Sequence, residues 1–158
     1  MRNKILAAAA LASSLLSGVA MAQERTFVFV APDRIGTNKA LAAMQSAVEQ
    51  TAAAQSASAR TFEGTDPATR RDSVQAAIDL GAEVVVVFGF EFGDIIADLG
   101  PANPDTKFAV VDTCVAEPTP NVYCGTFRQQ EVSYLVGAEA ALTSKTGVVA
   151  AVGALDIP

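Results

Sequence analysis

The chain has 158 residues, of which 51% are hydrophobic, and its 11 basic and 17 acidic side chains give a formal net charge of −6. That length suits one ordinary globular domain, and the acidic balance disfavours nucleic acid, whose binding relies on Lys and Arg to neutralise phosphates. The sequence contains no histidine, which removes the usual general base, the Ser-His and Cys-His nucleophile pairs and the commonest metal ligand. We therefore expect no catalytic residue, no metal site and no cofactor.

The first 22 residues have the pattern of a secretory signal peptide. Arg2 and Lys4 form a basic start, residues 5–16 form an apolar run shorter than the about 20 residues of a membrane-spanning helix, and Ala20-Met21-Ala22 is a small-x-small cleavage site. No cysteine lies near this site, so a lipid anchor is not indicated. We expect cleavage after Ala22 and export to a bacterial periplasm. Removal of 22 residues and their two basic side chains leaves 136 residues, with 9 basic and 17 acidic side chains and a net charge of −8.

The segment that follows begins with an expected strand over residues 26–31, a helix from about Asn38 and a short strand over residues 60–62. The next helix has clear signals, because Asp66-Pro67 supplies an N-cap with proline at the first helical position, and Gly81 ends it. The side chains expected to face the core from these two helices are Leu41, Met44, Val48, Val74, Ala77 and Ile78.

The second part of the chain continues this alternation. An unbroken β-branched run over residues 83–88 predicts a strand covered on both faces. The elements expected after it are a helix over residues 95–99 ending at Gly100-Pro101, strands over 108–112 and 121–126, a helix over 131–144 with Val132, Leu135, Ala138 and Leu142 inward, and a strand over 147–153. This order predicts an α/β fold, a parallel sheet with helices on both faces. Nothing after Gly153 closes a domain, so we expect a fragment of a longer protein.

Ligands of open α/β sheets bind beyond the carboxyl ends of the strands. In the first loop there, residues 32–38, Arg34 could offer polar contacts, while Asn38 could either contact a ligand or, like Thr37, cap the helix that follows. After the strand at 83–88 come Phe90 and Phe92, either of which could be a core residue, Phe92 more readily than Phe90.

Asp112 ends an apolar strand, where a buried and unpaired carboxylate would be costly. Such a carboxylate can accept two hydroxyl groups of a sugar, or it can cap a neighbouring backbone turn. The spacing by itself leaves both interpretations open.

Cys114 and Cys124 are the only cysteines, and an exported protein meets an oxidising environment. They lie on or beside neighbouring expected strands, which are about 4.8 Å apart and therefore within disulfide reach. They do not form a CxxC motif, and without histidine a metal site is improbable. We predict a structural disulfide.

Two stretches of sequence carry a resemblance to a known family. They are PDTKFAVVD (104–112) and NVYCGTFRQQEVSYLVGAEAALTSKTGVVAAVGALDIP (121–158), and GAEVVVVFGFEFGDII (81–96) supports them. They resemble the basic membrane protein family of ABC-transporter substrate-binding proteins, the purine-nucleoside receptor-like group. The shared features are a strand ending in Asp, T-F before an aromatic-Leu-x-Gly helix, T/S-K-T-G, a Val-rich strand and a Gly-x-x-Asp-Ile-Pro tail.

The resemblance implies the periplasmic-binding-protein type I fold, in which two lobes close on a ligand and deliver it to an inner-membrane ABC permease. Residues 1–22 would be the signal peptide, 23–126 lobe one and 127–158 the start of lobe two. Asp112 matches the carboxylate that holds ribose hydroxyls in the family. Asn38 is also kept, but Thr37 stands where the family has a stacking Phe, so the ligand is a nucleoside or another small polar metabolite. Arg34 and Phe90 are expected neighbours of that ligand.

Two other functions stay open at this stage. One is an exported α/β enzyme that uses a carboxylate as its base. The other is a receptor that presents its ligand to a membrane sensor.

Overall fold

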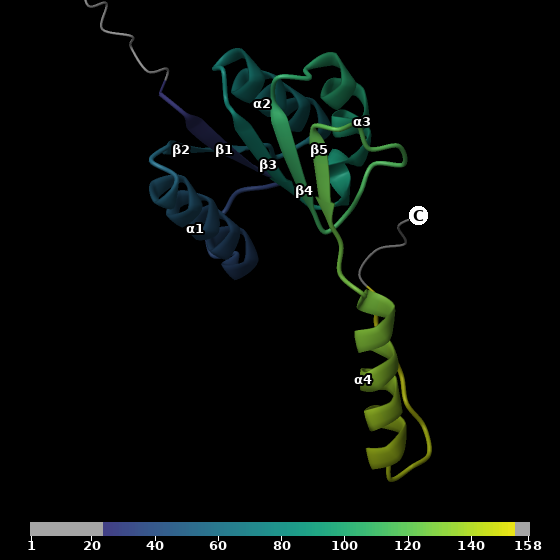
Figure 1. Cartoon of the computed structure of the whole chain (residues 1–158). Coiled ribbons are helices and arrows are strands. Elements are labelled where there is room, and N and C mark those ends of the chain that lie inside the picture. The colour runs from purple at the N-terminus through teal and green to yellow at the C-terminus, as the bar shows by residue number, and fades with distance from the viewer. Residues whose placement is uncertain (1–23, 154–158) are drawn as a thin grey trace, which may run out of the picture.

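The computed structural model describes residues 24–153, and the expected signal peptide, its cleavage site and most of the Gly-x-x-Asp-Ile-Pro tail lie outside these residues. Five parallel strands form one sheet in the order β2-β1-β3-β4-β5. Helix α1 covers one face, and α2 and α3 cover the other (Figure 1). The predicted α/β class, with helices on both faces of a parallel sheet, is therefore confirmed. The elements are β1 Thr26–Ala31, α1 Lys39–Ala54, β2 Ser58–Glu63, α2 Pro67–Asp79, β3 Val84–Phe88, the 3-10 turn η1 Phe90–Phe92, α3 Gly93–Ala102, β4 Lys107–Val111, β5 Val122–Gly125 and α4 Gln129–Thr143.

The core lies in two layers because β1 is central and alternates its side chains between the two faces. Val28 and Val30 pack on the side of α2 and α3, whereas Phe27 and Phe29 pack on the side of α1. Of the six side chains expected to face the core from α1 and α2, Leu41, Val48, Val74 and Ala77 are buried, and Met44 and Ile78 are partly buried.

The helix starts follow the sequence signals. The Asp66 side chain accepts hydrogen bonds from the backbone N–H groups of Ala68 and Thr69, and the Asp66 N–H donates to the Thr69 hydroxyl oxygen, which completes a capping box. The bonds from the two backbone N–H groups and the Thr69 hydroxyl hold the pKa of Asp66 below its usual range.

The predicted end of α3 at Gly100-Pro101 is wrong, because Pro101 lies inside the helix, which continues to Ala102, three residues beyond Leu99. Pro101 has no N–H to donate to the carbonyl four residues earlier, and the helix ends one residue after it. The Asn103 side chain donates to the Leu99 carbonyl at 2.8 Å and so satisfies part of the helix end.

In the last described segment the predicted helix is confirmed, but its predicted packing and the strand predicted after it are wrong. Helix α4 forms, but Figure 1 shows it leaving the sheet, and the side chains expected to face a core are exposed, with Val132 at 62%, Leu135 at 66% and Leu142 at 84%. Ala138 is only partly buried. Residues 147–153 do not form the expected strand. Strand hydrogen bonds need a neighbouring strand, and within residues 24–153 this segment has none.

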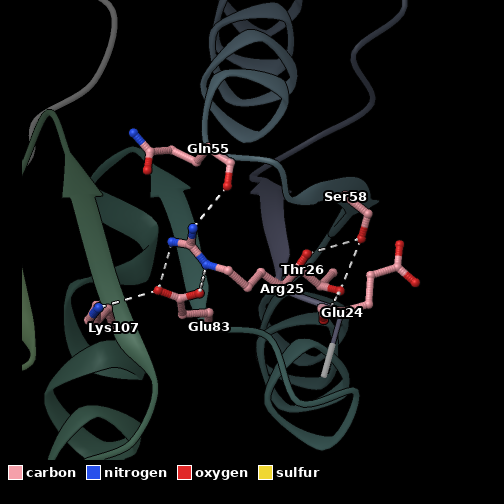
Figure 2. Close-up of polar contacts among 7 residues, drawn as sticks. All are labelled: Glu24, Arg25, Thr26, Gln55, Ser58, Glu83 and Lys107. Atoms are coloured by element: carbon pink, nitrogen blue, oxygen red, sulfur yellow. Dashed lines mark hydrogen bonds and ion pairs between the residues drawn. The ribbon is translucent and has the colours of Figure 1, made fainter. Parts of the chain in front are cut away.

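We call the side of the sheet where the strands begin the amino edge. A polar cluster there joins the amino-terminal ends of β1, β3 and β4 (Figure 2). The Arg25 guanidinium donates to both carboxylate oxygens of Glu83, at 2.6 and 3.1 Å, and to the Gln55 carbonyl at 2.9 Å. Lys107 lies 3.4 Å from the same carboxylate. The hydrogen bond from Arg25 and, more weakly, Lys107 hold the pKa of Glu83 below its usual range, although partial burial opposes them. The same pairing raises the pKa of Arg25.

Glu83→Gln tests this cluster. Because the folded pKa of Glu83 lies below its unfolded value, its charge stabilises the fold above the unfolded pKa, and this contribution is lost as the pH falls through the folded pKa. We expect urea unfolding to show wild type more stable than the variant at about pH 7, with the gap closing below about pH 4, where glutamate becomes protonated. Glu49→Gln, at an exposed position of α1, should show no such closing gap. A gap for Glu83→Gln that is the same at every pH would contradict the assignment.

Gly64 tests the packing of α2 against the end of β2. A Cβ at Gly64 would lie 2.7 Å from the Cα of Arg70, and Arg70 donates to the Pro32 carbonyl at 2.9 Å. We expect Gly64→Ala to lower the free energy of unfolding by about 1–3 kcal/mol, because backbone must move to relieve the clash. Gly93→Ala is the control, since a Cβ there meets nothing within 4 Å and alanine favours a helix by about 1 kcal/mol. Equal effects of the two substitutions would refute the packing argument.

Candidate functional site

The strands end together at what we call the carboxyl edge, which comprises residues 32–38, 89–92, 112–114 and 126–128, following β1, β3, β4 and β5 in turn. Backbone hydrogen bonds continue one step past the strands. The Gly89 N–H donates to the Val111 carbonyl at 3.0 Å, and the Asp112 N–H donates to the Gly125 carbonyl at 2.8 Å. Gly89 has a φ of 108°, which suits glycine and turns the chain sharply after β3. The loops therefore begin at one level, beside one another.

Asp112 is half-buried at this edge and has a φ of 76°, in the left-handed region. Its Oδ1 accepts a hydrogen bond of 2.8 Å from the Gln129 side chain. Among the described residues no backbone N–H donates to the carboxylate, and Oδ2 has no partner. Within the described residues the Asp112 side chain therefore does not cap a backbone turn. Gln129 holds one carboxylate oxygen, and the other accepts no hydrogen bond from the described residues.

The predicted disulfide between Cys114 and Cys124 is confirmed, with the two Cα atoms 5.2 Å apart. It joins the segment that follows Asp112 to β5, the neighbouring strand. Both cysteines are exposed, so the bond lies on the surface directly beside the candidate site.

Asn38 caps α1, and its Oδ1 accepts from the N–H groups of Ala40 and Leu41 at 3.0 and 3.2 Å. The capping alternative is therefore realised for Asn38 and not for Thr37. The amide nitrogen Nδ2 is the group that Asn38 can still present. Arg34 and Thr37 are both exposed in the same loop.

The two phenylalanines after β3 have different roles. Phe92 is completely buried and is part of the core, whereas Phe90 is 44% exposed. Phe90 therefore offers an aromatic surface at the carboxyl edge.

Three residues that organise this edge escaped the sequence analysis. Glu63 Oε1 accepts from the Ile35 N–H at 3.0 Å, Arg70 holds the Pro32 carbonyl and Gln129 holds Asp112. Glu63 is the last residue of β2. Its carboxylate at a strand end could have identified it as a residue of this edge, as it did for Asp112. Arg70 and Gln129 lie on helices, and no local pattern identifies their distant partners.

Two hollows lie away from this edge. The larger, about 560 Å³, is at the amino edge and is lined by Arg25, Glu83 and Asp105 among others. Arg25 and Glu83 pair with one another there, so neither is free to bind a ligand. The smaller, about 290 Å³, is apolar and lies between α1 and the sheet beside Val48 and Ala109.

Two findings limit what the described residues can do. Within residues 24–153, no group of three or more His, Cys, Asp or Glu side chains is placed to hold a metal ion. No helix among them has the length and apolar character to cross a membrane.

Comparison with known proteins identifies the family. The family described as ABC transporter substrate-binding protein PnrA-like (Bmp) matches residues 36–158. Basic membrane protein A1 of Borrelia garinii is 35% identical over 80 residues, which are 49% of this chain and 24% of that protein. The matched stretch thus covers about a quarter of the length of that relative.

Solved structures support the fold. An ABC transporter solute-binding protein from Aeropyrum pernix superposes with a TM-score of 0.62 at 24% identity, over 74% of this chain and 32% of that one. One from Clostridium phytofermentans with bound β-D-glucose gives a TM-score of 0.54 at 17% identity, over 75% and 39%. The family is one of substrate-binding proteins and not of enzymes. With more than half of its residues matched by the family, and with a parallel α/β sheet shared with solute-binding proteins, this chain belongs to the Bmp family of PnrA-like ABC transporter substrate-binding proteins.

Proposed function

We propose that this chain is part of an exported solute-binding protein that delivers a nucleoside, or a similar small polar metabolite, to an inner-membrane ABC permease. The observation that carries the proposal is Asp112, whose carboxylate lies at the carboxyl edge of a Bmp-family sheet and whose Oδ2 has no hydrogen-bond partner among the described residues. A carboxylate in that position accepts hydrogen bonds from hydroxyl groups, and charge-assisted bonds of this kind are strong. No bond of the ligand is made or broken in this role.

Residues 23–126 would form lobe one and residues 127–158 would begin lobe two, with the ligand enclosed between the lobes. Support comes from α4, which carries apolar side chains but buries none of them within the described residues. Tyr134 is 76% exposed and Leu142 84% exposed. Apolar surface of this kind is stabilised when other protein covers it. The solute-binding structures that match are also longer, since this chain covers 32% and 39% of them.

The ligand class follows from the side chains at the carboxyl edge. Asp112 suits a ligand with neighbouring hydroxyl groups, and Asn38 Nδ2 can donate to a polar atom. Thr37 supplies no aromatic ring, but Phe90 is exposed at the same edge and can stack on a flat base. Arg34 adds a cation nearby. These groups favour nucleosides, although β-D-glucose in the Clostridium phytofermentans protein makes sugars a necessary part of any ligand panel.

Asp112→Asn in the full-length protein tests the site, with isothermal calorimetry against purine and pyrimidine nucleosides, ribose and glucose. Loss of the charge should weaken binding of a hydroxyl-bearing ligand about 10- to 150-fold, because a hydrogen bond to a charged group contributes about 1.5–3 kcal/mol. Asp105→Asn, at an exposed position of the amino edge, should bind like wild type. If wild type binds none of the nucleosides, the ligand is not a nucleoside. If Asp112→Asn binds as tightly as wild type, Asp112 is not part of the site.

Asn38→Asp separates capping from ligand contact. An aspartate keeps the oxygen that accepts from Ala40 and Leu41 and caps a helix as well as asparagine does, but it has no amide N–H. We expect thermal stability to stay close to wild type while affinity falls by about 2- to 12-fold, which corresponds to about 0.5–1.5 kcal/mol for one lost hydrogen bond. Asn38→Ala should lose both stability and affinity. If Asn38→Asp binds as tightly as wild type, Asn38 only caps the helix.

A further inference from the structure

Asp112 adopts an unusual backbone conformation. Its φ of 76° lies in the left-handed region, and Ser56 is the only other described residue besides glycine with a positive φ. Aspartate tolerates this region better than most residues, but the conformation persists only when the surroundings impose it. The left-handed turn sets the direction in which the Asp112 side chain leaves β4. Whatever imposes the turn therefore also aims the carboxylate.

The surroundings of Asp112 form a small closed ring. The Asp112 N–H donates to the Gly125 carbonyl at 2.8 Å, Gly125 follows Cys124 directly, and the disulfide joins Cys124 to Cys114, two residues beyond Asp112. The ring is thus closed on one side by a hydrogen bond and on the other by a covalent bond. With both ends held, the Asp112–Cys114 segment has little freedom to leave the left-handed turn.

The two ends of β5 are anchored by different interactions. At the amino end, the Asn121 side chain donates to the carbonyls of Gly100, Asn103 and Thr106 at 2.9–3.0 Å. Along its whole length β5 is the outermost strand and pairs only with β4 among the described strands, so its carboxyl end has no second neighbouring strand. The disulfide is therefore the strong local restraint at the carboxyl end, whereas Asn121 holds the amino end without it.

We propose that the Cys114–Cys124 disulfide is a positioning element for Asp112, holding the left-handed turn that aims its carboxylate at the ligand. The part that concerns the ligand rests on the proposed function, whereas the part that concerns the backbone does not. A bridge that served only general stability would affect both ends of β5 alike.

Amide hydrogen exchange of the full chain tests the backbone part without any ligand. Two amides are compared: Asp112, bonded to Gly125 at the carboxyl end, and Phe108, bonded to the Asn121 carbonyl at the amino end at 2.8 Å. In Cys114→Ser/Cys124→Ser we expect the Asp112 amide to exchange at least about tenfold faster, with Phe108 within about twofold of wild type, because local opening has its own free energy. Asn121→Ala, with the disulfide intact, should give the opposite pattern.

Reduction of the folded wild-type protein is the second perturbation, in case the double variant does not fold. Dithiothreitol transfers two electrons and two protons to the disulfide, which yields two protein thiols and the cyclic disulfide of the reagent. The same selective acceleration at Asp112 is expected. Equal acceleration at both amides, no acceleration at either, or loss of the fold in both experiments would overturn the proposal.

A ligand comparison completes the test with adenosine and 3′-deoxyadenosine as probes. If the disulfide aims Asp112 at a hydroxyl group, the oxidised protein should bind adenosine at least about tenfold more tightly than the deoxy compound. That ratio should fall toward one in the double variant. An unchanged ratio would contradict the positioning role. If oxidised wild type binds neither compound, the proposed nucleoside function fails, and the exchange pattern alone decides whether the bridge positions Asp112.

Discussion

Parallel pairing on both sides of β1 is the constraint on which the rest of this structure depends. β1 forms backbone ladders with β2 and β3, and both of its faces are covered by helices, so all of its buried side chains, residues 27–31, are apolar. Parallel strands also point in one direction, and every loop that follows a strand emerges at the same edge. Residues far apart in sequence, such as Asn38, Phe90 and Asp112, are gathered at that edge for this reason alone.

The two edges of the sheet have different chemistry. At the amino edge, Arg25, Glu83 and Lys107 satisfy one another and join three strands, so their charges serve the fold. At the carboxyl edge the polar groups are only partly satisfied. Asp112 accepts from Gln129 with one of its two carboxylate oxygens, and Asn38 caps α1 with its oxygen, which leaves its amide nitrogen available. Groups with remaining hydrogen-bonding capacity can exchange water for a ligand, whereas a fully paired cluster gains nothing from one.

Local sequence signals predicted what depends on neighbours in the chain. The cap and proline at Asp66-Pro67, the β-branched run before Phe88 and the apolar positions of α1 each carry their structural reason within a few residues. The disulfide was also predictable, because the only two cysteines lie on or beside adjacent predicted strands and have one pairing available. Asn38 shows the limit: its type suits a cap and a ligand contact equally, and only the positions of the Ala40 and Leu41 N–H groups show that the cap is made.

The sequence by itself determined the order of strands and helices, the burial of β1 and the place of Asp112 at a strand end, because periodicity, capping residues and strand direction act over short distances. Tertiary structure alone decided that Glu63 holds Ile35, that Gln129 holds Asp112 and that Asp112 adopts a left-handed turn, since those partners are separated by long stretches of chain. It also decided the environment of α4 and residues 147–153. Their apolar pattern predicted a helix and a strand packed on a core, but a face is buried and a strand is paired only where a partner is present.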